Sequence, residues 1–394
     1  MFKAGHANSN WADKHILFIP TNYPTTYQPT RGIFFKDQAE ALAAEGVNVG
    51  VLAIAHLPWD VFKAKRIDIG LQTFQENNVN VFRFQTPAIP RNKYLYSDLK
   101  TIIGKYVFKK YVRKFGFPDL IHVHVFLAGG LAMWIKKKYN IPFVVTEHYS
   151  YFQTGTLRLW EDRLAKRIFR NSSLNISVSP STASYLQNRY KCPFHYLPNV
   201  VDTEFFRPNG DRNNKKLTFV SLGSLDSNKN HELMICALKK AMVELKIDDY
   251  ELKIIGEGPL RKHLSRLTAK NDLKQKVKLL GRLSRNEVRN EINSADYYVH
   301  SSHVETFCVS MIEAMSCGLP VLSTRCGGPE SIIVNDSLGL LCDINIDSLS
   351  EGLKKIISYQ FDRVKIRQYI INNFSKEVIA RKLLVGYQTV LDKI

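Results

Sequence analysis

Two glutamates with seven residues between them, Glu305 and Glu313, stand in the segment ETFCVSMIEAMSCGLPV (305–321). On one continuous helix they would lie about 12 Å apart along its axis. That is farther than the roughly 5–9.5 Å between the paired carboxyl groups of a glycosidase. We therefore expect Glu305 in the loop after the strand-like run YYVHSS (297–302) and Glu313 on the helix that follows. The start of that helix, around 307–310, would offer free N–H groups to an anion, and two solvated glutamates on a helix surface are the alternative.

The same half of the chain has two glycine turns after strand-like runs. In LTFVSLGSLDSNKN (217–230) the apolar run ends at Gly223 and a polar turn carries Lys229. Glycine permits close approach and lysine supplies a point charge for a phosphate, although a lysine near a helix start is often simply exposed. In KIIGEGPLRKHL (253–264), Gly256 and Gly258 suit close packing or the approach of a ligand. The G-x-G-x-x-G and downstream acid of a dinucleotide site are missing.

Polar residues also follow strand-like runs in the first half of the chain. TEHYSYF (146–152) places His148 at the end of such a run, and PTRGIFFKDQAEAL (29–42) places Gly32 before an expected helix. Each could face a ligand; a structural histidine and a plain turn at the start of a helix are the alternatives. LIHVHV (120–125) puts His122 and His124 on one face of a strand, because side chains alternate. With no third ligand nearby in sequence, we do not expect a zinc site.

Strand-like runs that alternate with helical stretches must position these residues. The pattern predicts an α/β fold with two doubly wound, Rossmann-like domains that face each other across a cleft. Ligands of such sheets bind outside the carboxyl ends of the strands. The runs are residues 15–20, 47–54, 79–84, 120–125, 143–148 and 174–179, followed by 217–223, 250–256, 277–281, 297–302, 320–324 and 338–342.

The division into two domains also suits the length of 394 residues. The segment FRPNGDRNNKK (206–216) is polar, contains Pro and Gly and has no apolar period, so we take it as a linker. It separates an N-terminal Rossmann-like domain, 1–205, from a C-terminal Rossmann-like domain, 217–394. The last helical pattern, VIARKLLVGYQTVL (378–391), is a candidate to pack back on the N-terminal domain.

The formal net charge of +19 is concentrated in the first half. Residues 1–205 contain 26 Lys and Arg against 14 Asp and Glu, and the remainder contains 29 against 22. Such a charge suits a phosphate-bearing substrate, an acidic lipid surface or nucleic acid. The basic run KYVFKKYVRKF (105–115), with WIKKKYN (134–140), has the pattern of a helix that lies on a membrane surface. A core-packed helix with a solvated basic face, or a nucleic-acid surface, explains it equally well.

Targeting signals and cysteines favour the cytoplasm. No apolar stretch approaches the roughly 18–20 residues needed to cross a bilayer, and the first residues lack the apolar region of a signal peptide. The six cysteines show no C-x-x-C and no disulfide framework, which favours reduced thiols.

The ordered series of motifs resembles the family 4 retaining glycosyltransferases, which have the GT-B architecture. The resemblance extends from about residue 15 to the C-terminus, and the series is far more specific than any one motif. It comprises PTRGIFFKDQAEAL, PFVVTEH, YLPNVVDTEFFRP (196–208), the Gly…Lys loop, the G-E-G-P turn, VKLLGRL, ADYYVHSS, the E-x7-E element and STRCGGPESI.

The resemblance implies a role for each matching residue. Glu313 would hold the ribose hydroxyls of a nucleotide, and Glu305 would hold the donor sugar. Lys229 would neutralise the diphosphate leaving group, His148 would face the donor sugar, and Gly32 would let the N-terminal loop approach it. The expected catalytic residues are therefore His148, Glu305 and Lys229, and the remaining donor-binding residues are Gly223, Ser224, Gly258 and Arg282, with the amides around Phe307, Cys308 and Val309 at the distal phosphate.

Three positions depart from the family pattern. Ser224 stands where many members have Arg, which leaves more of the phosphate charge to Lys229, with Arg282 as a candidate helper. Glu305-Thr306-Phe307-Cys308 replaces E-G-F-G, so the loop should be stiffer and its sugar pocket smaller. Val200 replaces the glycine of the PNGVD stretch. The chain contains no D-x-D motif, so we expect no metal and no cofactor beyond a UDP- or GDP-linked sugar as co-substrate.

These features predict a retaining hexosyltransferase that moves a sugar from a nucleotide diphosphate to a glycan or lipid-linked glycan. Bacterial surface polysaccharide biosynthesis is the expected setting, with the protein in the cytoplasm or bound peripherally at the inner membrane face, where an acidic membrane surface is a candidate partner. A sugar-nucleotide epimerase or a phosphorylase on the same architecture, and a basic nucleic-acid-binding protein, are the alternatives. The leading hypothesis includes no nucleic-acid partner.

Overall fold

A computed structural model describes residues 11–57, 69–87, 93–210 and 216–393. The start of the chain (1–10), where the sequence showed no signal-peptide pattern, and residues 211–215 of the expected linker lie outside this description. The chain divides into two compact units, each of which is described by itself. The first unit comprises residues 1–200 together with 376–394, and the second comprises 201–375.

The first unit is built on a sheet with the strand order β3-β4-β2-β1-β5-β6-β7-β8. All neighbouring strands are parallel except β3 and β4. The strands are β1 (His15–Pro20), β2 (Asn48–Leu57), β3 (Gly70–Glu76), β4 (Val79–Pro87), β5 (Leu120–His124), β6 (Phe143–Glu147), β7 (Leu174–Ser177) and β8 (His195–Tyr196).

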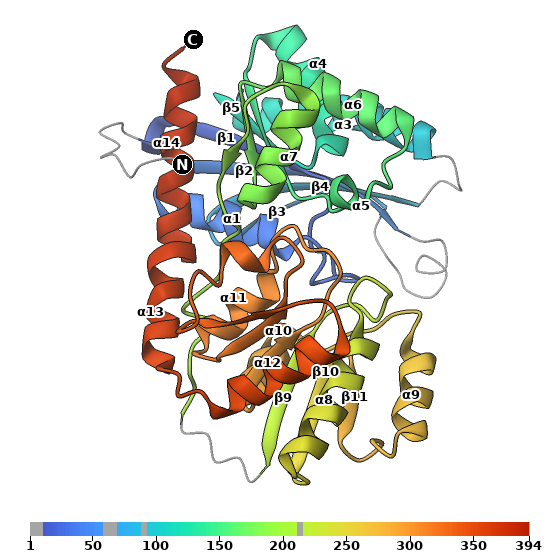
Figure 1. Cartoon of the computed structure of the whole chain (residues 1–394). Coiled ribbons are helices and arrows are strands. Elements are labelled where there is room, and N and C mark those ends of the chain that lie inside the picture. The colour runs from blue at the N-terminus through green and yellow to red at the C-terminus, as the bar shows by residue number, and fades with distance from the viewer. Residues whose placement is uncertain (1–10, 58–68, 88–92, 211–215, 394) are drawn as a thin grey trace. The chain divides into compact units, whose positions relative to one another are not determined.

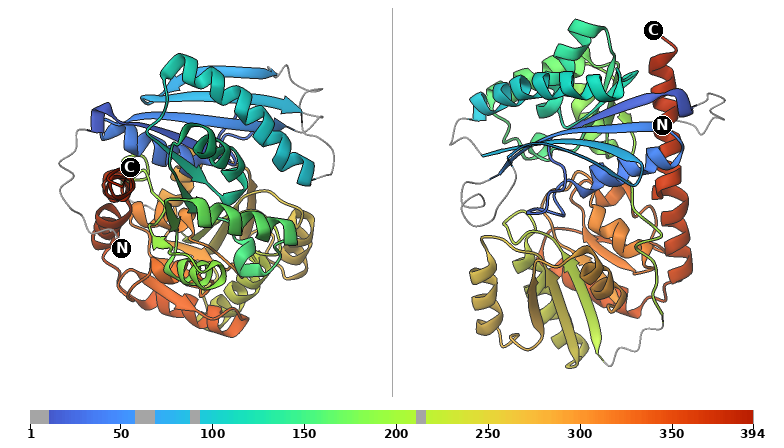
Figure 2. Two further views of the ribbon diagram at one scale, coloured as in Figure 1. Left: turned by 90° about the horizontal axis from the view of Figure 1, so that it is seen from above. Right: turned by 180° about the vertical axis from the view of Figure 1, so that it is seen from behind.

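Helices cover both faces of this sheet. Successive residues of a strand point to opposite faces, so each strand contributes side chains to two cores. In β1, Ile16 and Phe18 belong to the core beneath α1 and α14, whereas Leu17 and Ile19 belong to the core beneath α3, α4 and α6 (Figures 1 and 2). The helices are α1 (Ile33–Ala44), α3 (Lys93–Phe115), α4 (Gly129–Tyr139), α5 (Tyr151–Thr154), α6 (Leu159–Asn171), α7 (Pro180–Tyr190) and α14 (Lys376–Leu391), with short 3-10 turns η1 (Trp11–Asp13) and η2 (Phe126–Ala128).

The antiparallel edge strand β3 is absent from the sequence-based interpretation, which predicted parallel strands only. It forms a hairpin with β4 through Asn77 and Asn78, which have φ values of 44° and 63°. Left-handed conformation at both central residues is typical of a tight hairpin turn, and asparagine tolerates it well. The residues of β3 alternate between exposed and half-buried, so the strand lacks the apolar run by which the others were recognised.

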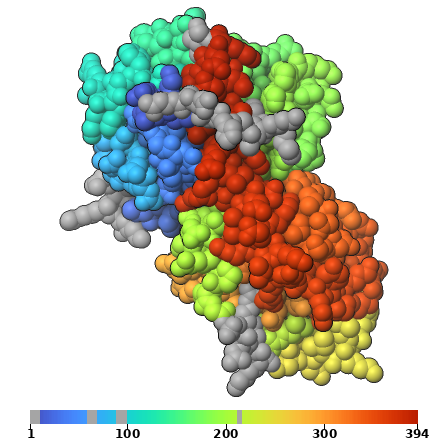
Figure 3. Space-filling model, turned by 90° about the vertical axis from the view of Figure 1, so that its left-hand side faces the viewer, coloured from blue at the N-terminus to red at the C-terminus, as the bar shows by residue number. Residues whose placement is uncertain are grey.

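The C-terminal helix α14 belongs to the first unit, although more than 170 residues of the second unit precede it in the chain. It packs beside α1, as the red and blue surfaces in Figure 3 show. Its Tyr387 is fully buried, and the Tyr387 hydroxyl lies 2.6 Å from Nδ1 of His122 on β5. Lys376 and Arg381 add ion pairs to Glu40 and Glu45 of the α1 segment.

The second unit contains six parallel strands in the order β11-β10-β9-β12-β13-β14. The order changes direction between β9 and β12, which is the topological switch point where doubly wound sheets bind ligands. The strands are β9 (Leu217–Leu222), β10 (Tyr250–Ile255), β11 (Val277–Gly281), β12 (Tyr297–His300), β13 (Val321–Thr324) and β14 (Gly339–Cys342).

One face of this sheet is covered by a large apolar core that includes α8, α9 and α12. On α11 the buried residues Met311, Ile312, Ala314 and Met315 hold that helix in the interior. The helices are α8 (His231–Leu245), α9 (Arg261–Lys270), α10 (Arg285–Asn293), α11 (Val309–Ser316), α12 (Ile346–Ser358) and α13 (Arg363–Phe374), with the 3-10 turn η3 (Pro329–Ser331).

We predict that Tyr387→Phe destabilises the first unit by about 1–3 kcal/mol, because it leaves a buried histidine nitrogen without its hydroxyl partner. All four tryptophans precede residue 200, so tryptophan fluorescence during urea unfolding reports on this unit. Tyr106→Phe is the matched control, since the Tyr106 side chain is largely exposed. Equal unfolding midpoints for the two variants would show that the hydroxyl contributes nothing to the docking of α14.

Candidate active site

The turn after β9 holds Lys229 in the position that the sequence suggested, just before α8. Asp226 organises this turn by accepting hydrogen bonds from the Ser224 hydroxyl and, at 3.1 Å, from the Lys229 N–H. Gly223 lies so close to the Lys229 stem that an added Cβ would come within 3.2 Å of it. The turn is therefore shaped to carry the lysine across the carboxyl end of β9.

The loop after β12 meets this turn through side chains that the sequence reasoning missed. The Asn228 side chain bonds both the carbonyl (2.9 Å) and the N–H (3.2 Å) of Val304. The Ser301 hydroxyl donates to the carbonyl groups of Lys229 and Asn230. The sequence did contain a signal for Asn228 and Ser301, because polar residues directly after two neighbouring strands are expected to meet at the switch point.

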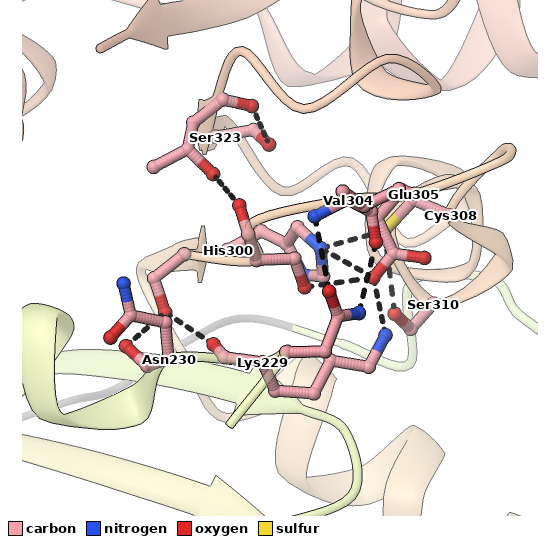
Figure 4. A network of polar contacts seen from close by, with 12 residues as sticks. Lys229, Asn230, His300, Val304, Glu305, Cys308, Ser310 and Ser323 are labelled. Carbon is pink, nitrogen blue, oxygen red and sulfur yellow. Dashed lines mark hydrogen bonds and ion pairs between the residues drawn. The ribbon is translucent and has the colours of Figure 1, made fainter. Parts of the chain in front are cut away.

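Glu305 lies in the loop after β12 and Glu313 on α11, as predicted from their spacing. One Glu305 oxygen, Oε1, is the centre of a polar network (Figure 4). It pairs with the Lys229 ammonium, accepts from the Ser302 hydroxyl at 2.8 Å, and lies 3.1 Å from Nε2 of His300. Among the described residues no hydrogen bond reaches Oε2, so the carboxylate is fixed by one oxygen and presents the other.

The ion pair controls the charge of this network. Burial alone would raise the pKa of Glu305, but the Lys229 charge and the His300 hydrogen bond hold it well below its usual range. Burial would lower the pKa of Lys229, but Glu305 outweighs burial and raises it. Burial likewise opposes charge on His300, whose pKa the neighbouring Cys308, Cys326 and Glu305 nevertheless raise well above its ordinary value. Lys229 and Glu305, which we call the central pair, are therefore both charged at neutral pH.

The helix α11 begins next to this network. Cys308 precedes it in a left-handed conformation with a φ of 97°, unusual for a residue other than glycine. The Cys308 thiol lies 3.7 Å from Nε2 of His300. The Phe307 side chain is buried against Phe374, so only its backbone is available to a ligand. The first N–H groups of a helix have no partner within it, and those at Val309 and beyond make this a candidate phosphate site.

Two glycines explain how neighbouring loops approach each other. A Cβ on Gly258 would come within 2.4 Å of the Leu225 carbonyl oxygen, so this residue lets the turn after β10 pack against the turn after β9. A Cβ on Gly328 would come within 2.2 Å of the Phe307 carbonyl oxygen, which lets the loop after β13 support the Glu305 loop.

Two of the expected donor-binding residues stand apart from the central pair. Arg282 is exposed after β11. In the described part of the chain, the hydrogen bonds and ion pairs that the Lys229 ammonium and the Glu305 carboxylate form do not include Arg282 or Glu313. The structure therefore brings Lys229 and Glu305 together and leaves the roles of these two residues as predictions.

The first unit positions the other two expected site residues, Gly32 and His148. Gly32 has a φ of 75° and caps α1, and a Cβ there would come within 2.7 Å of the Asn22 carbonyl oxygen. His148 follows β6, with the rings of Phe34 and Phe35 about 5 Å away and its Nε2 3.3 Å from Nδ1 of His124. Burial lowers the pKa of His148 to about 3, so the ring is neutral near pH 7.

His122 and His124 share one face of β5, as the alternation predicted, with ring centroids 4.1 Å apart. Both rings are fully buried. The described residues contain no group of three His, Cys, Asp or Glu side chains arranged to hold a metal ion.

A small pocket of the first unit lies beside β1 and β2, next to the turn that follows β5. It has a volume of about 20 Å³ and adjoins Lys100 of α3. The Lys100 ammonium donates to the Thr21 carbonyl at 3.2 Å. Burial, and then the positive charge of Arg31, lower the pKa of Lys100 to about 8. The lining residues are Ile19, Pro20, Thr21, Leu52, Ile54, Lys100, Thr101, Leu127, Ala128 and Leu131.

Two family models match the chain in sequence. Residues 202–376 match "Glycosyl transferases group 1", and residues 32–205 match "Glycosyltransferase Family 4". The chain belongs to the glycosyltransferase family that these two models describe. Together the two matches extend from residue 32 to residue 376, within the range over which the ordered series of motifs suggested the resemblance.

Curated relatives match in part or over most of their length. One component of the human phosphatidylinositol N-acetylglucosaminyltransferase is 36% identical over 162 residues, which are 41% of this chain and 33% of that protein. The match therefore spans about a third of the human relative. A putative teichuronic acid biosynthesis glycosyltransferase of Bacillus subtilis is 24% identical over 363 residues, 86% of this chain and 88% of that protein.

Solved structures have the same fold. Sucrose-phosphate synthase from Thermosynechococcus elongatus has a TM-score of 0.79 at 20% identity, and covers 97% of this chain and 100% of its own. Anabaena HepE, solved with UDP and glucose, has a TM-score of 0.72 at 15% identity and covers 95% of this chain and 99% of its own. The fold of this glycosyltransferase is therefore GT-B.

We predict that Lys229→Met lowers the free energy of unfolding of the second unit by about 1–3 kcal/mol at pH 7, because it leaves a partly buried carboxylate without its cation. Glu305 has a depressed pKa, so its contribution to stability is present above its unfolded value and is lost as the pH falls. The effect of the substitution should therefore shrink below about pH 4.5, the usual glutamate range.

Hydrogen exchange of the β12–α11 peptides during urea unfolding would measure this effect. Lys240→Met is the matched control, because the Lys240–Asp347 pair is exposed, and it should unfold like the wild type. An equal loss in both variants would mean that the central pair is no more important than a surface pair.

Proposed function

We propose that this glycosyltransferase moves a hexose from a nucleotide diphosphate to an acceptor, with retention of configuration and without a metal ion. The observation that carries the proposal is the partly buried Lys229–Glu305 pair, which lies at the switch point of the second unit beside the start of α11. A cation, a carboxylate with one oxygen available and the free N–H groups at the start of a helix together suit a sugar linked to a diphosphate. Retention and metal independence follow the family resemblance and the lack of a D-x-D motif.

The donor half of the mechanism follows from charge. As the bond between the sugar and the diphosphate breaks, positive charge develops on the sugar and negative charge on the leaving phosphate. The Lys229 ammonium and the N–H groups around Phe307, Cys308 and Val309 would stabilise that phosphate. Oε2 of Glu305 would accept hydrogen bonds from hydroxyl groups of the donor sugar, and Glu313 would accept hydrogen bonds from the hydroxyl groups of the ribose. Gly223, Ser224, Gly258 and Arg282 complete the proposed donor site.

The donor nucleotide in this proposal carries uracil or guanine. HepE, which has this fold, was solved with UDP and glucose, and that supports UDP as the first candidate to test. The base would lie near the end of β11, around Gly281 and Arg282.

The acceptor half belongs to the first unit in this proposal. His148 would face the transferred sugar as a neutral ring, and Gly32 would let the loop before α1 approach it. The small pocket beside Lys100 has apolar walls and a half-buried ammonium group, which suits contact with one anionic group of an acceptor. A lipid-linked glycan phosphate has this chemistry. The name of the Bacillus subtilis relative supports surface polysaccharide biosynthesis as the setting.

The outer face of α3 suits a peripheral site at the inner membrane face. Ile102 and Tyr106 are 61% and 54% exposed, one helical turn apart, and Phe117 just after the helix is 55% exposed. Lys109, Lys110, Arg113 and Lys114 surround them as exposed cations. An apolar strip flanked by cations is typical of a segment that binds an acidic bilayer. No helix in the described part of the chain has the length and hydropathy of a membrane span.

The donor proposal predicts that a UDP- or GDP-sugar raises the melting temperature of the wild type and that Glu313→Ala abolishes this shift, because the ribose contact is lost. A thermal-shift and donor-hydrolysis screen across UDP-, GDP- and ADP-sugars with EDTA present would measure it.

Lys229→Met should lower kcat by about 100- to 1,000-fold. Turnover that stops in EDTA would contradict metal independence, and a lack of stabilisation by every nucleotide sugar would contradict the donor site.

The membrane proposal predicts salt-sensitive binding to vesicles that contain anionic lipid. Each neutralised cation should cost about 1 kcal/mol of binding free energy, so the quadruple change of Lys109, Lys110, Arg113 and Lys114 to Gln should abolish co-sedimentation. Lys262, Lys270, Lys274 and Lys278, changed to Gln on the second unit, form the matched control with the same loss of charge. Equal binding by both quadruple variants would show that net charge, and not the α3 surface, is responsible.

A further inference from the structure

The Glu147 side chain ties two turns of the first unit together. Glu147 is the last residue of β6 and is fully buried. Its Oε1 accepts the N–H groups of His148 (2.9 Å) and Tyr149 (2.8 Å), which belong to the turn after β6. Its Oε2 accepts the N–H of Phe126 (3.0 Å), which belongs to the turn after β5. One carboxylate therefore satisfies three backbone donors from two turns.

The turn after β5 is strained and needs such support. Val125 has φ 70° and ψ 128°, and a β-branched residue is strained in this sparsely populated region. The Val125 N–H donates to the Thr146 carbonyl at 2.9 Å, and the next N–H, of Phe126, donates to Glu147. The turn continues into Leu127 and Ala128, which line the pocket beside Lys100.

The charge of Glu147 decides how strong all three bonds are. Hydrogen bonds to an ionised carboxylate are about twice as strong as hydrogen bonds between neutral groups. A protonated carboxyl also carries an O–H that needs an acceptor, and the hydrogen-bond partners of both Glu147 oxygens are N–H donors. Protonation therefore weakens the three bonds and loosens the two turns that they join.

Burial raises the pKa of Glu147 to about 7, although the three backbone bonds lower it. The neighbouring rings do not titrate in that range, since burial holds the pKa of His124 and His122 well below the ordinary value and that of His148 at about 3. The pKa of Tyr149 is raised by burial. The other groups whose charge acts on Tyr149 are Glu161, Tyr151 and Arg158.

We propose that Glu147 is a positioning residue: its ionised carboxylate holds His148 and the turn after β5 in the arrangement that sugar transfer needs, and its protonation releases them. The proposal deepens the proposed function, because it assumes that His148 faces the transferred sugar. It makes the site responsive to pH through a group that touches neither donor nor acceptor.

Stability and activity should respond to this proton in opposite directions. The pKa of Glu147 is raised above its unfolded value, so the folded chain binds the proton more tightly and this group stabilises the fold less as the pH rises from about 4.5 to about 7. The arrangement of His148 improves over the upper part of the same range. A carboxyl group with a merely structural role would move stability and activity together.

The first test needs no ligand. NMR of protein labelled at the histidine rings, with the His148 signal assigned by its loss in His148→Asn, should show that signal shifting with a midpoint near pH 7 while the ring stays neutral. Glu147→Gln should abolish the transition. Glu204→Gln, which removes the same charge at a side chain 79% exposed, should leave it intact. A His148 signal that does not change in the wild type, or an unchanged transition in Glu147→Gln, overturns the proposal.

The second test uses turnover of the nucleotide sugar found in the donor screen. The wild-type kcat should fall about tenfold from pH 8 to pH 6 as Glu147 takes up its proton. Glu147→Gln should have a kcat about 100-fold lower with no slope over this range, and an unchanged melting shift with donor. A slope that persists in Glu147→Gln overturns the proposal.

The two tests separate the possible failures. If no nucleotide sugar is turned over, the proposed function fails and the NMR titration still decides the role of Glu147. If Glu147→Gln does not fold, the wild-type titration decides, because a His148 signal that is constant between pH 6 and pH 8 contradicts the inference.

Discussion

The chemistry of this chain depends on the reversal of strand order at the switch point of each sheet. At a reversal the connections that leave two neighbouring strands run to opposite sides, which opens a crevice outside the carboxyl ends of the strands. Polar side chains can lie in that crevice without entering the core. In the second unit the loops after β9 and β12 meet there, and the Lys229–Glu305 pair joins them. Without a partner, either charge would be too costly to bury. The pair therefore holds the two loops together.

The first unit solves the same problem with a different kind of bond. Its reversal lies between β1 and β5, and the supporting acid, Glu147, pairs with backbone N–H groups and not with a cation. Burial raises the pKa of Glu147 to about 7, because its amide partners only partly oppose burial, whereas the charge of Lys229 holds the pKa of Glu305 well below its usual range. Glu147 ends β6, one strand beyond the reversal, and Glu305 follows β12 at the reversal, so the two acids differ both in place and in how readily they take up a proton.

Much of the fold could be read from the sequence, because buried parallel strands are apolar runs. The position of Glu305 in a loop and Glu313 on a helix also followed, since one helix would hold them too far apart. The hairpin strand β3 did not follow, because its residues are only half-buried and its signal was the pair Asn77–Asn78. Asn228, Ser301 and Glu147 were missed because their importance comes from backbone groups that approach them in space. The roles assigned to individual site residues stay predictions.

The docking of α14 on the first unit has a consequence for how the chain is made. Residues 201–375 form an insertion within the first unit, whose last helix is synthesised only after the whole second unit. Until then, the apolar residues of α1 that face α14, and the ring of His122, lack the surface that covers them. The second unit is continuous in sequence and can complete its core during synthesis. The order of folding on the ribosome would therefore be the reverse of the order of the units, and the N-terminal unit would be the one that needs protection while it waits.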